Sequence, residues 1–236
     1  MIFLAASAAT LPACSWPADR PVEAEVPVLS VVATVPSSGA EGVPTDAVIE
    51  LGFDAWPESP VPGGVVRMTA GVVDVGVQLE VDLVGRKLRV TPARYGEQPP
   101  RLLDPQTGYT VVVAPALRAT GGATLAAPFI LKFRTGDTPA GRTARPMPRF
   151  GEVHAGVIAA ACRDCHASPA LDLSNEDAAF AALAGQPARV IAGNSAASGL
   201  LRKLVGTPDT GGAAHLPLSD AQLALVRDWI DAGAQR

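Results

Sequence analysis

Residues 73–83 read Val-Asp-Val-Gly-Val-Gln-Leu-Glu-Val-Asp-Leu, and this stretch decides the fold of the first half of the chain. Every odd position is aliphatic, whereas every even position is polar or glycine. Because side chains alternate between the two faces of a strand, the pattern predicts one antiparallel β-strand with a single buried face. We therefore expect the carboxylates of this stretch to lie on a solvated outward face of the sheet.

The same two-residue period recurs in other short segments before residue 137. They lie at residues 48–53, 87–91, 109–113 and 129–135, and a further β-rich run covers residues 28–35. Clusters of Gly, Pro and Asp separate the segments. Short strands with regular turn signals predict a β-sandwich over residues 27–137. The Cys…Trp…Cys spacing of antibody domains does not occur, which excludes that class.

Several segments of this half carry a resemblance to a known family. Residues 36–46 read PSSGAEGVPTD before the strand at 48–53, residues 88–92 read LRVTP, and a Gly-Gly turn lies within residues 117–135. These segments resemble the bacterial Ig-like domain of cell-surface and S-layer proteins. The resemblance implies a spacer or docking module rather than a catalyst. The residues agree, since no histidine precedes residue 154.

Composition excludes several classes of protein. The chain has 236 residues, of which 48% are hydrophobic and 18% charged, so it can bury a real core. Its net charge of −4 argues against a nucleic-acid partner held by a basic face. Three cysteines are too few for a disulfide framework, and no uncharged apolar run approaches the roughly 20 residues that span a bilayer.

The amino terminus has the composition of an export signal. Residues 1–14 are apolar and end in small residues, and residues 11–14 read Leu-Pro-Ala-Cys. The latter resembles a bacterial lipoprotein signal, which implies lipidation of Cys14; a plain secretory signal and a chance cysteine are the alternatives. Residues 15–26 are polar and Pro-containing, as in a tether. We therefore expect a periplasmic protein or one associated with the outer membrane or cell surface.

The period changes after a Pro-rich, basic linker at residues 138–149. We expect its three arginines mainly to keep a hinge soluble. Residues 150–236 then show helical spacing, with short helices expected at 178–184, 187–191 and 196–205. Ser219 and Gln222 form the sequence pattern of a capping box, followed by the apolar stripe Leu223, Val226, Trp229 and Ile230. The stripe should pack the last helix of a small all-α unit.

Residues 162–166 read Cys-Arg-Asp-Cys-His, the C-x-x-C-H attachment signature of c-type haem. Two thiols three residues apart at the end of a helical turn can both reach the vinyl groups of one porphyrin as thioethers. The imidazole of His166 is then placed under the iron as proximal ligand. The motif predicts one covalent haem c on Cys162, Cys165 and His166.

Three other interpretations compete with haem. A structural zinc site usually needs four ligands, commonly two such cysteine pairs, and only one pair is present. A catalytic dithiol normally opens a helix after a strand in a βαβ unit, and that context is missing. The third alternative is a chance C-x-x-C-H sequence.

Further segments of residues 150–236 extend the similarity beyond the motif. They are LDLS at 171–174, SGLLRKL at 198–204, LPLS at 216–219 and WIDAGA at 229–234. These features resemble small bacterial c-type cytochrome domains. The resemblance implies two domains, an all-β Ig-like sandwich followed by a small all-α cytochrome c domain. In that family a Met-Pro pair before the last helix commonly supplies the sixth iron ligand, whereas Leu216-Pro217 stands here.

The missing methionine leaves the sixth iron ligand open. His215 immediately precedes Leu216 and is the preferred distal ligand. His154 lies two helical turns before Cys162, and Met147 lies in the linker. An open five-coordinate iron is the remaining alternative.

Ligation decides the expected function. With His166 and His215 both bound, the iron is saturated, and we expect an electron carrier rather than an enzyme, with a lower potential than a His/Met relative. An open site would favour a haem peroxidase or a small-ligand sensor. A surface structural or adhesion protein without haem is the third hypothesis. Residues 150–236 hold six basic and nine acidic residues, a net charge of −3, which favours a redox partner with a basic docking face.

Overall fold

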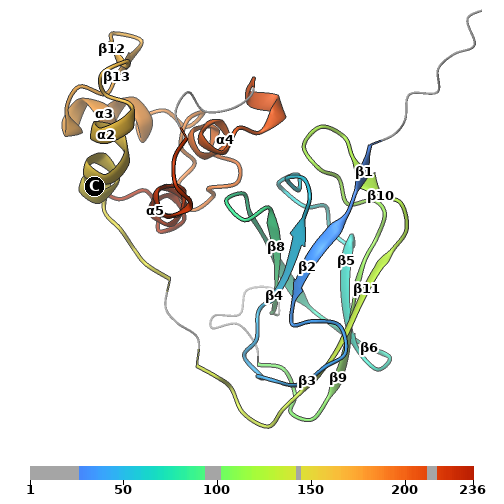
Figure 1. Cartoon of the computed structure of the whole chain (residues 1–236). Coiled ribbons are helices and arrows are strands. Elements are labelled where there is room, and N and C mark those ends of the chain that lie inside the picture. Colours follow the sequence, from blue (N-terminus) through green and yellow to red (C-terminus); the bar gives the residue numbers. More distant parts are fainter. Residues whose placement is uncertain (1–26, 94–101, 142–144, 212–216) are drawn as a thin grey trace, which may run out of the picture.

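The fold is that of a computed structural model, which describes residues 27–93, 102–141, 145–211 and 217–236. Figure 1 shows a β-sandwich, here called the sandwich (residues 27–137), beside a smaller C-terminal unit (residues 150–236). In the described part of the chain, the helices are all too short to cross a membrane. The two units touch along one face of the sandwich.

The sandwich is built from two main sheets. One sheet is antiparallel and has the order β2 (Val31–Val35), β4 (Ile49–Phe53), β8 (Lys87–Pro92) and β7 (Val77–Asp82). The other has the order β3 (Ala40–Val43), β11 (Phe129–Thr135), β9 (Gly108–Val113), β5 (Val66–Ala70) and β6 (Val73–Val75). A short parallel pair joins β1 (Val28–Leu29) to β10 (Thr124–Leu125). The prediction of a β-sandwich over residues 27–137 is confirmed.

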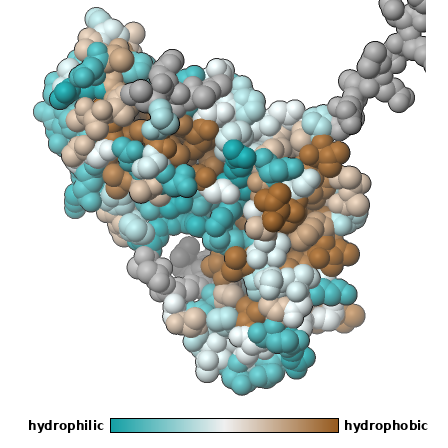
Figure 2. All heavy atoms as spheres, in the orientation of Figure 1, coloured by the Kyte–Doolittle hydropathy of each residue, from teal (hydrophilic) through white to brown (hydrophobic). Residues whose placement is uncertain are grey.

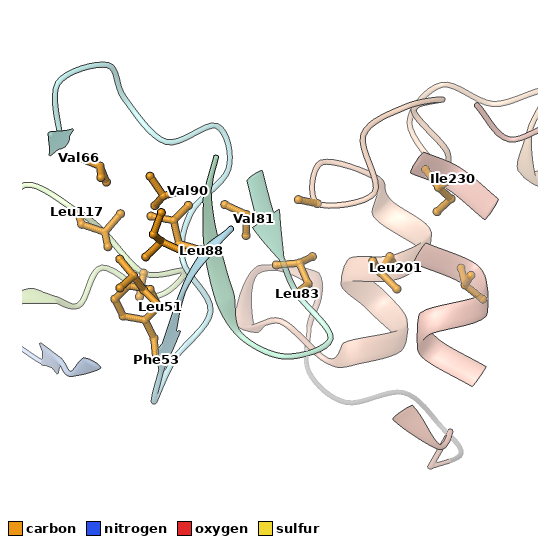
Figure 3. Close-up of a cluster of buried hydrophobic side chains, with 14 of the residues drawn as sticks. Leu51, Phe53, Val66, Val81, Leu83, Leu88, Val90, Leu117, Leu201 and Ile230 are labelled. Atoms are coloured by element: carbon orange, nitrogen blue, oxygen red, sulfur yellow. The ribbon is translucent and has the colours of Figure 1, made fainter. Parts of the chain in front are cut away.

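The core of the sandwich follows from the alternation of its strands. Leu51 on β4 and Leu88 and Val90 on β8 are fully buried, as are Val111 and Leu131 on the opposite sheet. On β8, β9 and β11 the neighbours of these residues along the strand are more exposed, as a two-layer sandwich requires. Figure 3 follows the buried cluster from this interior through Val81 and Leu83 to Leu201 and Ile230 of the C-terminal unit. The hydrophobic core is therefore continuous across the two units.

The stretch at residues 73–83 is not the single strand that its alternation predicts. The chain breaks at Gly76, so that β6 pairs with β5 in one sheet while β7 pairs with β8 in the other. Gly76 takes an even position in the pattern, which keeps the aliphatic residues in phase on both sides of the break. Alternation reports which face of a strand is buried but not to which sheet the strand belongs.

The C-terminal unit consists of short elements. They are α1 (Phe150–Val153), the π-helix η1 (His154–Ile158), α2 (Ala159–Ala161), β12 (Ala167–Ser168), β13 (Leu171–Asp172), α3 (Glu176–Leu183), α4 (Gly199–Val205), the 3₁₀ turn η2 (Pro208–Thr210) and α5 (Asp220–Asp231). Ser219 and Gln222 form the expected capping box at the start of α5. Val226, Trp229 and Ile230 are fully buried, so the predicted packing of the last helix is confirmed.

The prediction of an all-α cytochrome c domain over residues 150–236 is wrong. In the described ranges the chain is mainly β-sheet with short helices, and the C-terminal unit itself contains the β12–β13 hairpin. Residues 187–189 form a turn and residues 190–191 are irregular, and the helix expected at 196–205 begins only at Gly199. Gly185, Pro187 and Gly193 lie between α3 and α4, where they interrupt helical hydrogen bonding that apolar spacing alone favours.

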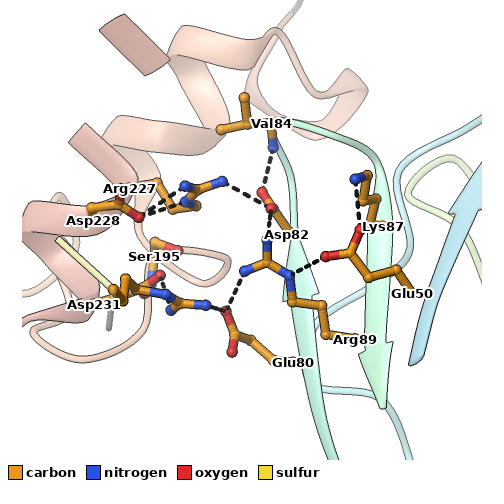
Figure 4. A network of polar contacts seen from close by, with 11 residues as sticks. Glu50, Glu80, Asp82, Val84, Lys87, Arg89, Ser195, Arg227, Asp228 and Asp231 are labelled. Carbon is orange, nitrogen blue, oxygen red and sulfur yellow. Dashed lines mark hydrogen bonds and ion pairs between the residues drawn. The ribbon is translucent and has the colours of Figure 1, made fainter. Parts of the chain in front are cut away.

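An ion-pair network joins the two units (Figure 4). Arg227 on α5 contacts Asp82 on β7 at 2.9 Å and also its own neighbour Asp228 at 2.9 Å. Arg89 on β8 reaches the same Asp82 at 3.3 Å. Only 3% of the Asp82 side chain is exposed. The expectation of a solvated outward face is therefore wrong at this position, because α5 covers that face.

The linker takes part in the same contact. Arg145 pairs with Glu80 on β7 at 2.7 Å and with Asp231 at the end of α5 at 3.2 Å. At the other end of the linker, the buried carboxylate of Asp46 accepts hydrogen bonds from the backbone N–H groups of Ala140 and Gly141. These contacts tie the linker to the units that it connects.

Candidate functional site

The C-x-x-C-H segment continues the turn of α2. The backbone N–H of Cys162 donates to the carbonyl of Ile158 at 2.9 Å, and that of His166 donates to the carbonyl of Cys162 at 3.1 Å. The carbonyl of His166 then accepts from Leu173 at 2.7 Å, which closes the β12–β13 hairpin behind the motif. This winding holds both thiols and the imidazole on the wall of the same cavity.

The cavity has a volume of about 650 Å³ and a largely apolar lining. This volume lies within the range of about 300–1,000 Å³ that is usual for small-molecule and cofactor sites. It is lined by Ile158, Ala161, Cys162, Cys165, His166, Leu171, Leu173, Leu183, Leu200, Lys203, Leu204 and Leu218. Figure 2 shows hydrophobic residues gathered on the face of the C-terminal unit where Figure 1 places α2, α3 and α4.

Both cysteines of the motif carry free thiols, with Cys162 half-buried and Cys165 exposed. Burial raises the pKa of the Cys162 thiol, and the neighbouring Cys165 adds to the rise. The thiol of Cys162 therefore stays protonated at neutral pH. Within the described residues, no group of three or more His, Cys, Asp and Glu side chains is arranged to hold a metal ion.

These residues fit a covalently attached porphyrin. A porphyrin presents a large apolar surface, and leucines from β13, α3 and α4 provide an apolar lining of suitable size. The thiols that would form thioethers, Cys162 and Cys165, are unpaired and lie on the wall of this cavity. The imidazole of His166 lies on the same wall, where a neutral ring nitrogen is a suitable ligand for iron.

The other predicted ligands are not brought to this cavity within the described residues. Met147 is 78% exposed in the linker. His154 lies in the π-helix η1 and does not line the cavity. His215, the preferred distal ligand, and Cys14, the candidate lipidation site, both lie outside the described residues. The sixth ligand therefore stays a prediction.

The π-helix η1 is separated from the motif only by the short helix α2, and it explains the placement of His154. A π-helical turn inserts one extra residue, so it rotates the side chains before it relative to those after it. His154 faces Phe150, with their ring centres 6.2 Å apart, and its Nε2 atom is buried without a hydrogen-bond partner among the described residues. Counting two helical turns back from Cys162 therefore did not predict the position of His154.

A second hollow, of about 370 Å³, lies between the C-terminal unit and the sandwich. Leu204 and Leu218 border both this hollow and the first cavity. From the sandwich come Trp56 and Arg86, whose guanidinium group lies 4.4 Å from the centre of the indole ring. Sandwich residues are therefore neighbours of the wall of the candidate site.

Sequence reasoning missed the residues of α4 that line the cavity. Leu200, Lys203 and Leu204 follow one another at the spacing of a single helix face, and this signal is present in the sequence. The spacing marks a face but does not show that the face borders a cavity rather than a packed core. Only the packing of α4 relative to α2 supplies that information.

Comparisons with known proteins identify the first half of the chain. Residues 25–135 match the family of bacterial Ig-like domains. No curated protein sequence matches the chain significantly.

Among solved structures, CopC from Methylosinus trichosporium OB3b is 12% identical with a TM-score of 0.34, over 49% of this chain and 99% of CopC. The native alpha-2-macroglobulin of Escherichia coli is 18% identical with a TM-score of 0.35, over 53% of this chain and 7% of that protein. The S-layer protein rSbsC is 16% identical with a TM-score of 0.35, over 52% of this chain and 16% of its own.

Proposed function

We propose that this chain, whose residues 25–135 match a bacterial Ig-like domain, is an exported haem protein that transfers single electrons. One covalent haem c is attached to the C-terminal unit. The observation that carries the proposal is the convergence of Cys162, Cys165 and His166 on one apolar cavity.

Each residue of the site has a defined part in this function. Cys162 and Cys165 would hold the porphyrin as thioethers, and His166 would bind the iron as proximal ligand. When bound, haem supplies a reversible one-electron couple between ferric and ferrous iron. Leu171, Leu173 and the leucines of α4 line the cavity and would shield the bound haem from water, and such burial tunes the potential of an iron centre.

The Ig-like domain holds the haem-bearing unit in place in this proposal. Arg227 and Asp82 join α5 to β7, and Arg145 joins the linker to both. An electron carrier gains from a fixed orientation, because the distance to its partner governs transfer. Partners would be redox proteins with a basic face, since residues 150–236 carry a net charge of −3. If raising the ionic strength leaves the transfer rate unchanged, this choice of partner is wrong.

The test of the proposal is attachment of haem to the full chain. We expect the chain, produced together with a haem-attachment machinery, to be coloured and to keep its pigment in acidic acetone. Cys162→Ala with Cys165→Ala should lose covalent pigment, whereas Cys14→Ser is the matched control and should keep it. A colourless wild-type chain, or pigment that acidic acetone extracts, would overturn the proposal.

The same preparation tests ligation of the iron. We expect a low-spin spectrum that changes little when carbon monoxide is added. His215→Ala should give a high-spin ferric spectrum and fast binding of carbon monoxide, while His154→Ala and Met147→Ala should leave the spectrum unchanged. An unchanged low-spin spectrum of His215→Ala would remove His215 from the site. Fast carbon monoxide binding by the wild type would favour a sensor or peroxidase instead.

A further inference from the structure

Helix α4 presents one face to the cavity, formed by Leu200, Lys203 and Leu204. Residues three and four positions apart lie on the same side of a helix, so Lys203 belongs to the lining as much as the two leucines do. Among the described lining residues, it is the one side chain that carries a full charge at neutral pH. The apolar wall therefore contains a single fixed cation.

The contacts of Lys203 leave its charge without a counter-ion among the described residues. Its Nζ donates to the backbone carbonyl of Thr210 at 3.1 Å, and the side chain is half-buried. The adjacent Arg202 differs, because its guanidinium pairs with the carboxylate of Asp209. Its ammonium group can therefore pair with a carboxylate of a bound molecule through a charge-assisted hydrogen bond.

We infer, on the basis of the proposed function, that Lys203 binds a propionate carboxylate of the haem and thereby fixes its orientation. The vinyl and propionate groups stand on opposite edges of a porphyrin. Cys162 and Cys165 follow α2, and α4 stands apart from α2 across the C-terminal unit (Figure 1). A porphyrin tied to the two cysteines by its vinyl edge therefore directs its propionates toward α4.

The first test measures the midpoint potential of the covalent haem protein as a function of pH. Removing a cation beside the propionates favours ferric iron and makes the propionates harder to ionise. Lys203→Met should therefore lower the potential at pH 7 and move its pH-dependent step to higher pH. Lys203→Arg should restore the wild-type profile. Arg202→Gln removes a charge from the same helix without touching the cavity lining, and it should behave as wild type.

The second test asks whether the carboxylate is what Lys203 recognises. The full chain with Cys162→Ala and Cys165→Ala is titrated with free haem and with its dimethyl ester, which lacks the charged carboxylates. Adding Lys203→Met should weaken haem binding about tenfold or more, as expected for a hydrogen bond to a charged group, and should leave ester binding unchanged.

The outcomes separate this inference from the proposed function. A coloured Lys203→Met protein with the potential and pH profile of Arg202→Gln overturns the role of Lys203 and leaves the proposed function intact. Equal weakening of haem and ester binding by Lys203→Met, equal affinity of the parent chain for both, or no binding of either also overturns it. A colourless wild-type chain overturns both proposals.

Discussion

The sandwich and the C-terminal unit differ in how completely their own side chains fill the interior. In the sandwich, fully buried residues from both sheets, such as Leu51 and Val111, fill the space between the layers. In the C-terminal unit, Phe150 and Trp229 pack on the α5 side with their ring centres 5.1 Å apart. The α2–α4 side instead encloses the cavity of about 650 Å³. One unit is complete as a protein core, and the other leaves room for a large apolar molecule.

The largest expected effect tests this contrast with one substitution in each unit. Leu51→Ala removes a fully buried side chain between two sheets and should cost about 2–5 kcal/mol of the free energy of unfolding. Leu204 borders an existing cavity and is only partly buried. In the chain without haem, Leu204→Ala should therefore cost about 1 kcal/mol, because it removes little buried apolar surface. Urea unfolding of both variants measures the difference. Equal losses would show that the C-terminal unit is as tightly packed as the sandwich.

The second prediction compares Asp74 and Asp82, two carboxylates that occupy equivalent polar positions in the alternating stretch at residues 73–83. Asp82 is buried against Arg227 and Arg89, so Asp82→Asn should cost about 2 kcal/mol, because each arginine loses one of its carboxylate partners. Asp74 pairs with Arg67 on an exposed strand, with both side chains about two-thirds exposed. Asp74→Asn should therefore change stability by less than about 0.5 kcal/mol.

A double-mutant cycle isolates the contact between the units. Asp82→Asn and Arg227→Met should be strongly non-additive in urea unfolding, because each removes the same pair. Additive effects of the two substitutions would show that Arg227 and Asp82 do not interact across the contact between the units, even if each variant alone is destabilised.

These two aspartates also mark what the sequence could predict. Alternation over residues 73–83 was enough to predict strands and a sandwich, because burial of one face leaves a local, two-residue signature. It could not predict the break at Gly76 or the burial of Asp82. Both depend on which distant element packs on the strand, and no local pattern records that.

The sequence likewise predicts one part of the candidate site and not the other. The spacing of Cys162, Cys165 and His166 placed them together, since one turn of chain fixes their relation. The cavity that they line, and the part of Lys203 in it, depend on how α4 packs against residues far away in the sequence. The all-α prediction failed because helical spacing of apolar residues does not suffice to form helices in segments that Gly and Pro interrupt.

The third prediction concerns the loss of stability at acidic pH and the part of Glu50 in it. Although burial acts to raise the pKa of Glu50, the hydrogen bonds and charges of Lys87 and Arg89 bring it below its ordinary value of 4.5. A carboxyl whose pKa is lowered by folding stabilises the folded chain above its ordinary pKa. This stabilisation is lost as the pH falls below 4.5 through the lower folded value.

Glu50→Gln should therefore flatten the loss of stability in this acidic range, measured as urea midpoints at a series of pH values. Glu58, which is exposed on the sandwich, serves as the matched control, and Glu58→Gln should follow the wild-type curve. A wild-type acid slope in Glu50→Gln would show that the network of Lys87 and Arg89 does not govern this step.

The last prediction concerns Arg145, and it bears on the comparison of the two units most directly. Its side chain is 35% exposed, so loss of its pairs with Glu80 and Asp231 in Arg145→Ala should cost at most about 1 kcal/mol. The guanidinium nevertheless touches both units, so its loss should widen the distribution of their relative orientation. Distances between spin labels on β4 and α3 would measure that width.

Arg134→Ala removes an exposed arginine from the far sheet and should leave the width unchanged. If Arg145→Ala also leaves it unchanged, the contact of Arg227 with Asp82 and the shared hydrophobic core are sufficient to orient the C-terminal unit. The C-terminal unit would then depend on the sandwich through these contacts, and the linker would serve only as a connection.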